Sequence, residues 1–176
     1  KTTTLKACCG ILGFEEGEIF VDGVSIKKNP VVCKRELAYI PDNPELYDYL
    51  SGSKYLAFVA DVYGVSASER SRIIDSLAEK LGIKSDLAAP IGPYSHGMKQ
   101  KLALIAAWLH SPKLIIMDEP FVGLDPRASH TLKEMMRIFK NIVEKRNFYI
   151  TVFAQQASYL QQASGALCEM TETTDL

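Results

Sequence analysis

Residues 94–126, YSHGMKQKLALIAAWLHSPKLIIMDEPFVGLDP, decide the fold of this chain. The apolar run at residues 113–117 is typical of a strand buried on both faces of a parallel sheet, and Asp118 and Glu119 follow it directly. Nucleotide-binding α/β folds place their ligands at the carboxyl ends of such strands. The stretch therefore predicts a parallel sheet with two carboxylates at its binding edge. Exposed carboxylates are also common after strands that bind nothing, so the pair needs support from elsewhere in the chain.

The composition is that of an ordinary globular protein of 176 residues, with 47% hydrophobic and 23% charged residues. Twenty basic against 21 acidic residues give a net charge of −1, so we expect no nucleic-acid binding driven by bulk charge. No apolar run approaches the roughly 18 to 20 residues that a membrane helix needs, so we expect any membrane role to require a partner. Four cysteines without C-x-x-C spacing indicate reduced thiols in a cytosolic setting: Cys8, Cys9, Cys33 and Cys168.

Alternating strands and helices lie on both sides of a wholly helical insert, which predicts an α/β domain with a helical subdomain. Asp22-Gly23 is typical of a two-residue hairpin turn, and Ser66-x-x-Glu69 of a capping box. The expected elements are a helix over 1–12 followed by Gly13, a hairpin over 18–26, strands over 37–40, 113–117 and 148–153, and helices over 54–63, 67–81, 96–109 and from 126 onwards. We divide the chain into a domain over 1–153, with its helical subdomain at about 51–96, and an atypical polar tail over 154–176.

Two segments have residues suited to phosphate and a third has residues suited to Mg²⁺. Lys1 and Thr2 have the order that ends a G-x-x-x-x-G-K-[ST] loop, although a terminal Lys-Thr is by itself a weak signal. Ser95 can cap a helix and offer donors to an anion, and a simple cap explains it about equally well. One carboxylate beyond a strand suits Mg²⁺, and a neighbouring carboxylate can orient or deprotonate an attacking water.

Together these segments resemble the ATP-binding cassette (ABC) ATPases, which have a P-loop NTPase-type parallel sheet core with antiparallel strands and a helical subdomain. The resemblance covers residues 1–153 and has its four motifs in the family's order. The sequence around the signature is most similar to that of ATPase subunits of bacterial multidrug, bacteriocin or sodium exporters. The matching segments are KTT at residues 1–3 for the end of Walker A, SHGMKQ at 95–100 for the LSGGQ signature, LIIMDEP at 114–120 for Walker B, and GLDP at 123–126 for the D-loop.

The resemblance implies ATP and Mg²⁺ as cofactors, with a role for each matching residue. Lys1 is expected to contact the β- and γ-phosphates, Thr2 to bind Mg²⁺, and Thr3 to lie near the α-phosphate. Asp118 is expected to hold Mg²⁺, and Glu119 to act on the hydrolytic water. These roles are those of an ATPase that splits ATP into ADP and phosphate.

The family mechanism implies two partners. Ser95 and Gly97 are expected to contact the γ-phosphate of ATP bound by a second cassette, and Asp125 to lie at that dimer interface. The cassettes form a homodimer or a pair that closes on ATP and reopens after hydrolysis, which moves a transmembrane permease subunit. We therefore expect a cytoplasmic chain held at the inner face of the cell membrane through this permease.

Four departures from the family pattern qualify this expectation. The glycine-rich part of the phosphate loop is absent before Lys1, and Asp42 stands where the family has the Q-loop Gln, within reach of Mg²⁺. His96 and Met98 replace the usual Gly and Gln of the signature. Gln156 stands at the switch-His position, where it can donate to a γ-phosphate but cannot carry positive charge.

These departures predict a fragment of an exporter ATPase, whose tail after about residue 153 is read in a shifted frame. Alternatives are an inactive cassette remnant, or a non-transport ABC protein that acts on the ribosome or DNA. Proteins of the latter kind have paired cassettes or long coiled coils in place of the short helical insert. Two further histidines, His110 and His130, are expected at the surface.

Overall fold

The structure, a computed structural model, describes residues 2–146 and 149–153, with side chains as far as residue 138. Three parallel strands form its main sheet in the order β3 (Leu37–Ile40), β4 (Leu114–Asp118) and β5 (Tyr149–Phe153). Hydrophobic clusters lie on both faces of this sheet and bury Ile115, Ile116 and Met117 of β4. The predicted parallel-sheet strand before Asp118 is therefore confirmed.

A small antiparallel hairpin precedes this sheet in the chain. Strands β1 (Phe20–Val21) and β2 (Val24–Ser25) pair around Asp22 and Gly23, whose φ angles are 49° and 75°. A two-residue turn that matches the twist of its strands needs positive φ at both central positions, which Asp-Gly adopts readily. The predicted hairpin is confirmed.

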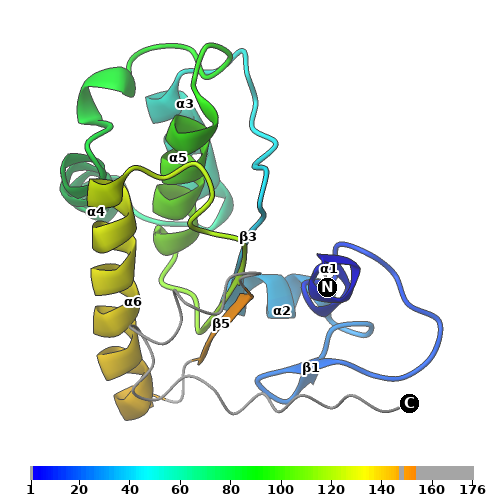
Figure 1. The fold of residues 1–176 in the computed structure, drawn as a ribbon. Helices are drawn as coiled ribbons and strands as arrows, with labels where there is room; N and C mark the ends of the chain where they lie inside the picture. The colour runs from blue at the N-terminus through cyan, green and yellow to red at the C-terminus, as the bar shows by residue number, and fades with distance from the viewer. Residues whose placement is uncertain (1, 147–148, 154–176) are drawn as a thin grey trace.

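Helices cover both faces of the main sheet (Figure 1). Residues that alternate along β4 belong to different hydrophobic clusters: Ile115 and Met117 pack with α3, α4, α5 and α6, whereas Ile116 packs with α1, α2 and the hairpin. These helices are α1 (Thr2–Cys8), α2 (Pro30–Glu36), α3 (Gly52–Val62), α4 (Ala67–Leu81), α5 (His96–Trp108) and α6 (Pro126–Arg146).

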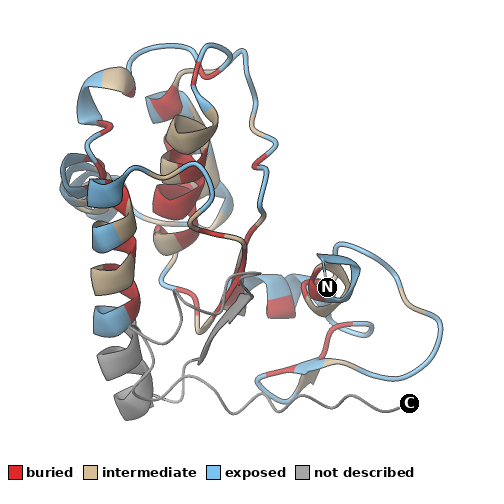
Figure 2. Cartoon of the chain, viewed as in Figure 1, coloured by how far each residue is buried: buried red, intermediate tan, exposed pale blue. Residues whose placement is uncertain are grey.

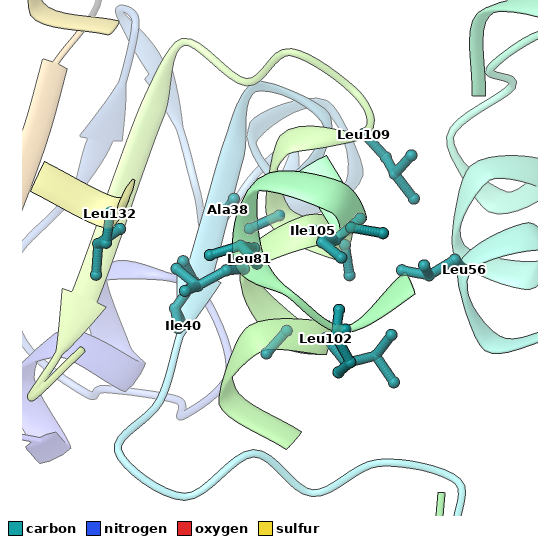
Figure 3. Packing of buried hydrophobic residues seen from close by; sticks show 14 of the residues in the cluster. Ala38, Ile40, Leu56, Leu81, Leu102, Ile105, Leu109 and Leu132 are labelled. Atoms are coloured by element: carbon teal, nitrogen blue, oxygen red, sulfur yellow. The ribbon is translucent and has the colours of Figure 1, made fainter. Parts of the chain in front are cut away.

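The buried faces of the helices turn towards the strands and towards one another (Figure 2). The larger cluster joins α5 to its neighbours, and Figure 3 shows Leu102 and Ile105 of α5 near Leu56 of α3 and Ile40 of β3. All four side chains are essentially inaccessible to solvent. Burial of this kind contributes about 25 cal/mol for each Å² of apolar surface removed from water. The core therefore fixes α5 against the sheet.

Side-chain caps set the ends of the helices in the insert. Ser51 and Ser66 each accept a hydrogen bond from the backbone N–H three residues later, and Gly82 ends α4 with a φ of 66°. A short 3₁₀ helix, Lys84–Asp86, follows. The predicted helices are thus confirmed, while the division into a domain and a helical subdomain at 51–96 stays a prediction.

Near the start of the chain, one local prediction is wrong and one helix was not predicted. The first helix ends at Cys8 instead of residue 12, because Gly10 takes a left-handed φ of 64° and turns the chain. Gly13 is therefore not the residue that ends it. Helix α2 was not predicted at all, although Pro30 at its first turn is a recognised start signal. Its Val31 and Val32 are exposed, so it has no apolar stripe for periodicity to detect.

The expectation that His110 is a surface residue is also wrong. Its ring is partly buried and stacks on Tyr63, with centroids 3.7 Å apart, and its Nε2 lies 3.3 Å from the carbonyl oxygen of Leu37. Burial lowers the pKa of His110 below its ordinary value. His110 therefore joins the ends of α5 and α3 to the start of β3. His130, by contrast, is exposed on α6 as expected.

Candidate functional site

The candidate site lies where β4 ends beside the start of α1. Asp118 is the last residue of β4 and is 4% exposed, and Thr2 is the first residue of α1. The Thr2 hydroxyl donates a hydrogen bond of 2.7 Å to Oδ2 of Asp118, although 116 residues separate the two in the chain. A buried carboxylate needs such a donor because its desolvation is otherwise unfavourable. The fold thus brings together two of the three residues proposed from sequence as Mg²⁺ ligands, Thr2 and Asp118.

Glu119 follows Asp118 with an unusual backbone. Its φ is 48°, in the left-handed region that residues with a Cβ rarely adopt, and its side chain is partly buried. Its carbonyl oxygen accepts a hydrogen bond from Val122, which closes the turn after the strand. Unfavoured backbone of this kind costs about 1 to 3 kcal/mol and concentrates at functional sites. The turn therefore begins directly at the two successive carboxylates at the end of β4.

The other residues proposed to bind this chain's own nucleotide have no described side-chain contact with the Thr2–Asp118 pair. Thr3 is exposed on the first turn of α1. Asp42 is exposed just beyond β3, at the same sheet edge, where its carboxylate accepts a 2.8 Å hydrogen bond from the N–H of Asn43. Lys1 and Gln156 lie outside the described residues. No contact that the structure describes joins Asp42 to Asp118.

The donor set at Thr2 and Asp118 fits Mg²⁺. This ion takes oxygen ligands, commonly only one or two from protein carboxylates, and keeps several waters. A hydroxyl and a carboxylate 2.7 Å apart supply such oxygens, and Glu119 adds a second carboxylate beside them. Within residues 2–138 no three His, Cys, Asp or Glu side chains cluster as a transition-metal site requires. The hydroxyl and carboxylate oxygens of Thr2 and Asp118 are donors that suit a hard cation.

Ser95 and Gly97 lie at the N-terminus of α5, as the signature predicts. The Ser95 hydroxyl accepts a 3.3 Å hydrogen bond from the N–H of Met98 and so caps the helix. Gly97 lies against Gly123: a Cβ on Gly97 would be 2.2 Å from the Gly123 carbonyl oxygen. In turn, a Cβ on Gly123 would be 2.3 Å from Cδ2 of His96. The signature and the 123–126 turn are therefore interlocked, and only glycines fit at both positions.

Asp125 extends this connection. Its Oδ1 accepts a 2.8 Å hydrogen bond from the N–H of Ala128 at the start of α6, and its other oxygen pairs with Nζ of Lys101 from α5. The hydrogen bond from Lys101, followed by that from Ala128, holds the pKa of Asp125 below its ordinary value. Asp125 thus joins α5 and α6 within the chain. The role proposed for it at a dimer interface stays a prediction.

Tyr39 on β3 is a polar residue of the site that sequence reasoning missed. Its hydroxyl is buried and has no hydrogen-bond partner among the described residues. Burial, and then the negative charge of Asp118, raise the pKa of Tyr39 to about 12. Strand alternation was the available signal: Ala38 and Ile40 face α5, so Tyr39 must face α1.

Comparison with known proteins assigns this arrangement to a family. The geometry defines the class of protein. It is an α/β fold of the nucleotide-binding kind, with the Thr2–Asp118 pair at the edge of its sheet. Residues 1–122 match the family model described as "ABC transporter". The chain belongs to this family, among its ATP-binding proteins. The resemblance predicted from the motifs is therefore confirmed.

Similar proteins include two from Bacillus. The chain is 33% identical over 162 residues to the uncharacterised ABC transporter ATP-binding protein YhcH of Bacillus subtilis, covering 92% of this chain and 51% of that protein. It is 32% identical over 162 residues to the bacitracin transport ATP-binding protein BcrA of Bacillus licheniformis, with the same coverage. The chain thus spans about half the length of these curated relatives.

Solved structures support the fold. The structure of an ATP-binding subunit of an ABC transporter matches with a TM-score of 0.82 and 34% identity, covering 92% of this chain and 66% of that one. The predicted P-loop NTPase-type fold, with a parallel sheet and an antiparallel pair, is confirmed. Among the described residues, no helix is both long enough and apolar enough to span a membrane.

Proposed function

We propose that this chain provides the ATP-binding and ATP-hydrolysing part of an ABC exporter, working through a nucleotide-sandwich dimer. The observation that carries the proposal is the 2.7 Å hydrogen bond from Thr2 to Asp118. It joins the start of α1, a helix end suited to phosphate, to the carboxylate suited to Mg²⁺. ATP is the expected nucleotide because the chain belongs to the ABC transporter family.

Each residue of the site has a distinct part in this proposal. Thr2 and Asp118 would hold Mg²⁺, which would supply positive charge beside the phosphates of the nucleotide. Glu119, in the turn directly after β4, would orient the hydrolytic water and accept its proton. Ser95 and Gly97 present the N-terminus of α5 to the nucleotide of a second cassette.

The experiment uses the protein that contains this chain and separates metal binding from hydrolysis. Glu119→Gln should retain binding of ATP with Mn²⁺ and lower the hydrolysis rate at least about 100-fold. Asp118→Asn should lower the affinity for Mn²⁺ at least about tenfold. Glu69→Gln, an exposed change on α4, is the matched control and should alter neither. Hydrolysis unchanged in Glu119→Gln would refute the proposed role, and a parent that binds no ATP would favour an inactive cassette.

An exposed aromatic patch supports the proposed membrane partner. Tyr47, Tyr49 and Phe58 form this aromatic patch together with the partly buried Tyr55, with ring centroids 5.8 to 6.2 Å apart around Tyr47. Tyr49 is 80% exposed, and Tyr47 and Phe58 are about half exposed. Clustered exposed rings mark interaction surfaces, and relatives such as BcrA are named as transport proteins. We propose that this patch docks the transmembrane permease subunit and holds the chain at the inner face of the membrane.

The patch is connected to the proposed ATP-contacting helix. Asp48, between two patch residues, forms an ion pair of 2.9 Å with Lys99 of α5, and its carbonyl oxygen accepts a hydrogen bond from Gly92. A partner that moves the patch would therefore move the segment that leads to Ser95. Replacing Tyr49 and Phe58 by serine should release the protein from membranes that carry its permease, with ATP binding retained. Val62→Ser, which lies on α3 with Phe58 but outside the patch, should not release the protein. Equal release by both variants would exclude this docking surface.

A further inference from the structure

The Tyr39 hydroxyl is an isolated polar group in the layer between the sheet and α1. Its oxygen is inaccessible to solvent and bonds to nothing among the described residues. Native proteins pair most buried polar groups, because an unpaired one costs about 1 to 3 kcal/mol. A site that uses the group only when a ligand is present explains such an exception.

The strand register places Tyr39 beside the Thr2–Asp118 pair. Tyr39 is opposite Ile116 in the parallel pairing of β3 with β4, and both pack into the cluster that contains Leu5 of α1. Since side chains alternate along a strand, Asp118, two residues after Ile116, faces the same side. Strand spacing and rise place the Cα atoms of Tyr39 and Asp118 about 8 Å apart, a separation that a tyrosine side chain can span.

The electrostatics agree with this placement. After burial, the carboxylate of Asp118 is the largest influence that raises the pKa of Tyr39, and Asp42 acts in the same direction. Both carboxylates are acids that we propose for the metal site. The Tyr39 hydroxyl is protonated at neutral pH, as that of an ordinary tyrosine is, and so is available as a donor.

We propose that Tyr39 is a positioning residue of the metal site, whose hydroxyl donates a hydrogen bond to a water molecule ordered beside Asp118 when metal and nucleotide are bound. This inference rests on the proposed function of Thr2 and Asp118. The unpaired Tyr39 hydroxyl would then have an acceptor only when metal and nucleotide are bound. Outer-shell hydrogen bonds of this kind orient a ligating carboxylate and change metal affinity by about 10- to 100-fold at most.

A purely structural tyrosine and a positioning tyrosine respond differently to loss of the hydroxyl. Tyr39→Phe keeps the ring in its cluster and removes an unpaired buried donor. The thermal midpoint of the unliganded protein should therefore not fall, and we expect a rise of up to about 4 °C. Affinity for Mn²⁺ in the presence of a non-hydrolysable ATP analogue should instead fall roughly three- to tenfold. A higher thermal midpoint without ligand, together with a lower affinity for Mn²⁺, indicates a positioning role.

The experiment measures Mn²⁺ binding by electron paramagnetic resonance and the thermal midpoint, for the protein that contains this chain and three variants. Tyr63→Phe is the matched control, since it removes a hydroxyl from the residue that ends α3 and should leave Mn²⁺ affinity unchanged. Asp118→Asn separates the two levels of inference. If Asp118→Asn weakens Mn²⁺ binding and Tyr39→Phe does not, the role of Tyr39 is refuted while the proposed function stands. If the parent binds no Mn²⁺ with the analogue, or Asp118→Asn has no effect, both fail.

Discussion

Gly97→Ala adds a methyl group where the structure leaves no space for one. The added Cβ would lie 2.2 Å from the carbonyl oxygen of Gly123 and 3.2 Å from its carbonyl carbon. Both atoms belong to the backbone, so no side-chain rotation can relieve the overlap. Either the first turn of α5 or the turn at Gly123 must move.

The expected loss of stability follows from the size of this overlap. Overpacking costs about 1 to 3 kcal/mol, and a contact with backbone belongs near the upper end of that range. Alanine has a better helix propensity than glycine, which offsets up to about 1 kcal/mol. A net loss of about 2 kcal/mol remains, which lowers the thermal midpoint by about 4 to 8 °C in a domain of this size.

Gly13→Ala provides the matched control for this prediction. A Cβ on Gly13 would have no atom within 4 Å, and its φ is not left-handed. The same substitution should therefore leave stability unchanged or raise it by a few tenths to 1 kcal/mol. Thermal unfolding of parent and both variants tests the contrast. If Gly97→Ala unfolds at the same temperature as Gly13→Ala, the interlock of the signature with the 123–126 turn is not as close as described.

Two further predictions concern pH. Lys101 holds the folded-state pKa of Asp125 low, so this carboxylate stabilises the fold above its unfolded pKa, near 3.9. That stability is lost as the pH falls further. In urea unfolding, Lys101→Met should make the free energy of unfolding fall less steeply below pH 4. Burial lowers the folded-state pKa of His110, so protonation opposes folding and stability should fall as pH drops below about 6.5. His110→Phe, which keeps a ring against Tyr63, should flatten the difference in unfolding free energy between pH 8 and 5.5.

Each pH prediction has an outcome that contradicts it. An unchanged acid slope in Lys101→Met would mean that Asp125 gains nothing from its cationic partner. A variant His110→Phe with the parent's full pH dependence would show that His110 is not its source. Measurement at two salt concentrations separates exposed ion pairs from buried groups, because salt screens the former more strongly.

The sequence predicted elements best where local signals agreed with packing. Helix α4 has a serine cap at Ser66 and a glycine end at Gly82, and both occur as expected. The failures have physical causes. Leu12 extended an apparent apolar period beyond the real end of α1, yet it is exposed because Gly10 turns the chain before it.

The candidate site was less accessible to local reasoning. Thr2 and Asp118 are 116 residues apart, so no periodicity links them, and their pairing was expected only through the family resemblance. Gly97 was proposed as a phosphate contact, and its tight packing against Gly123 has no sequence signal. Tyr39 lies in a strand of four residues, too short for its alternation to attract notice.

The left-handed backbone at Glu119 has a consequence for the evolution of this chain. Glycine adopts a φ of 48° without strain, so Glu119→Gly would relax the turn by roughly 1 kcal/mol. Glutamate and glycine codons differ by a single base. The same one-step mutation would remove the proposed water-activating carboxylate, so position 119 is a point where greater stability and lost catalysis arise together.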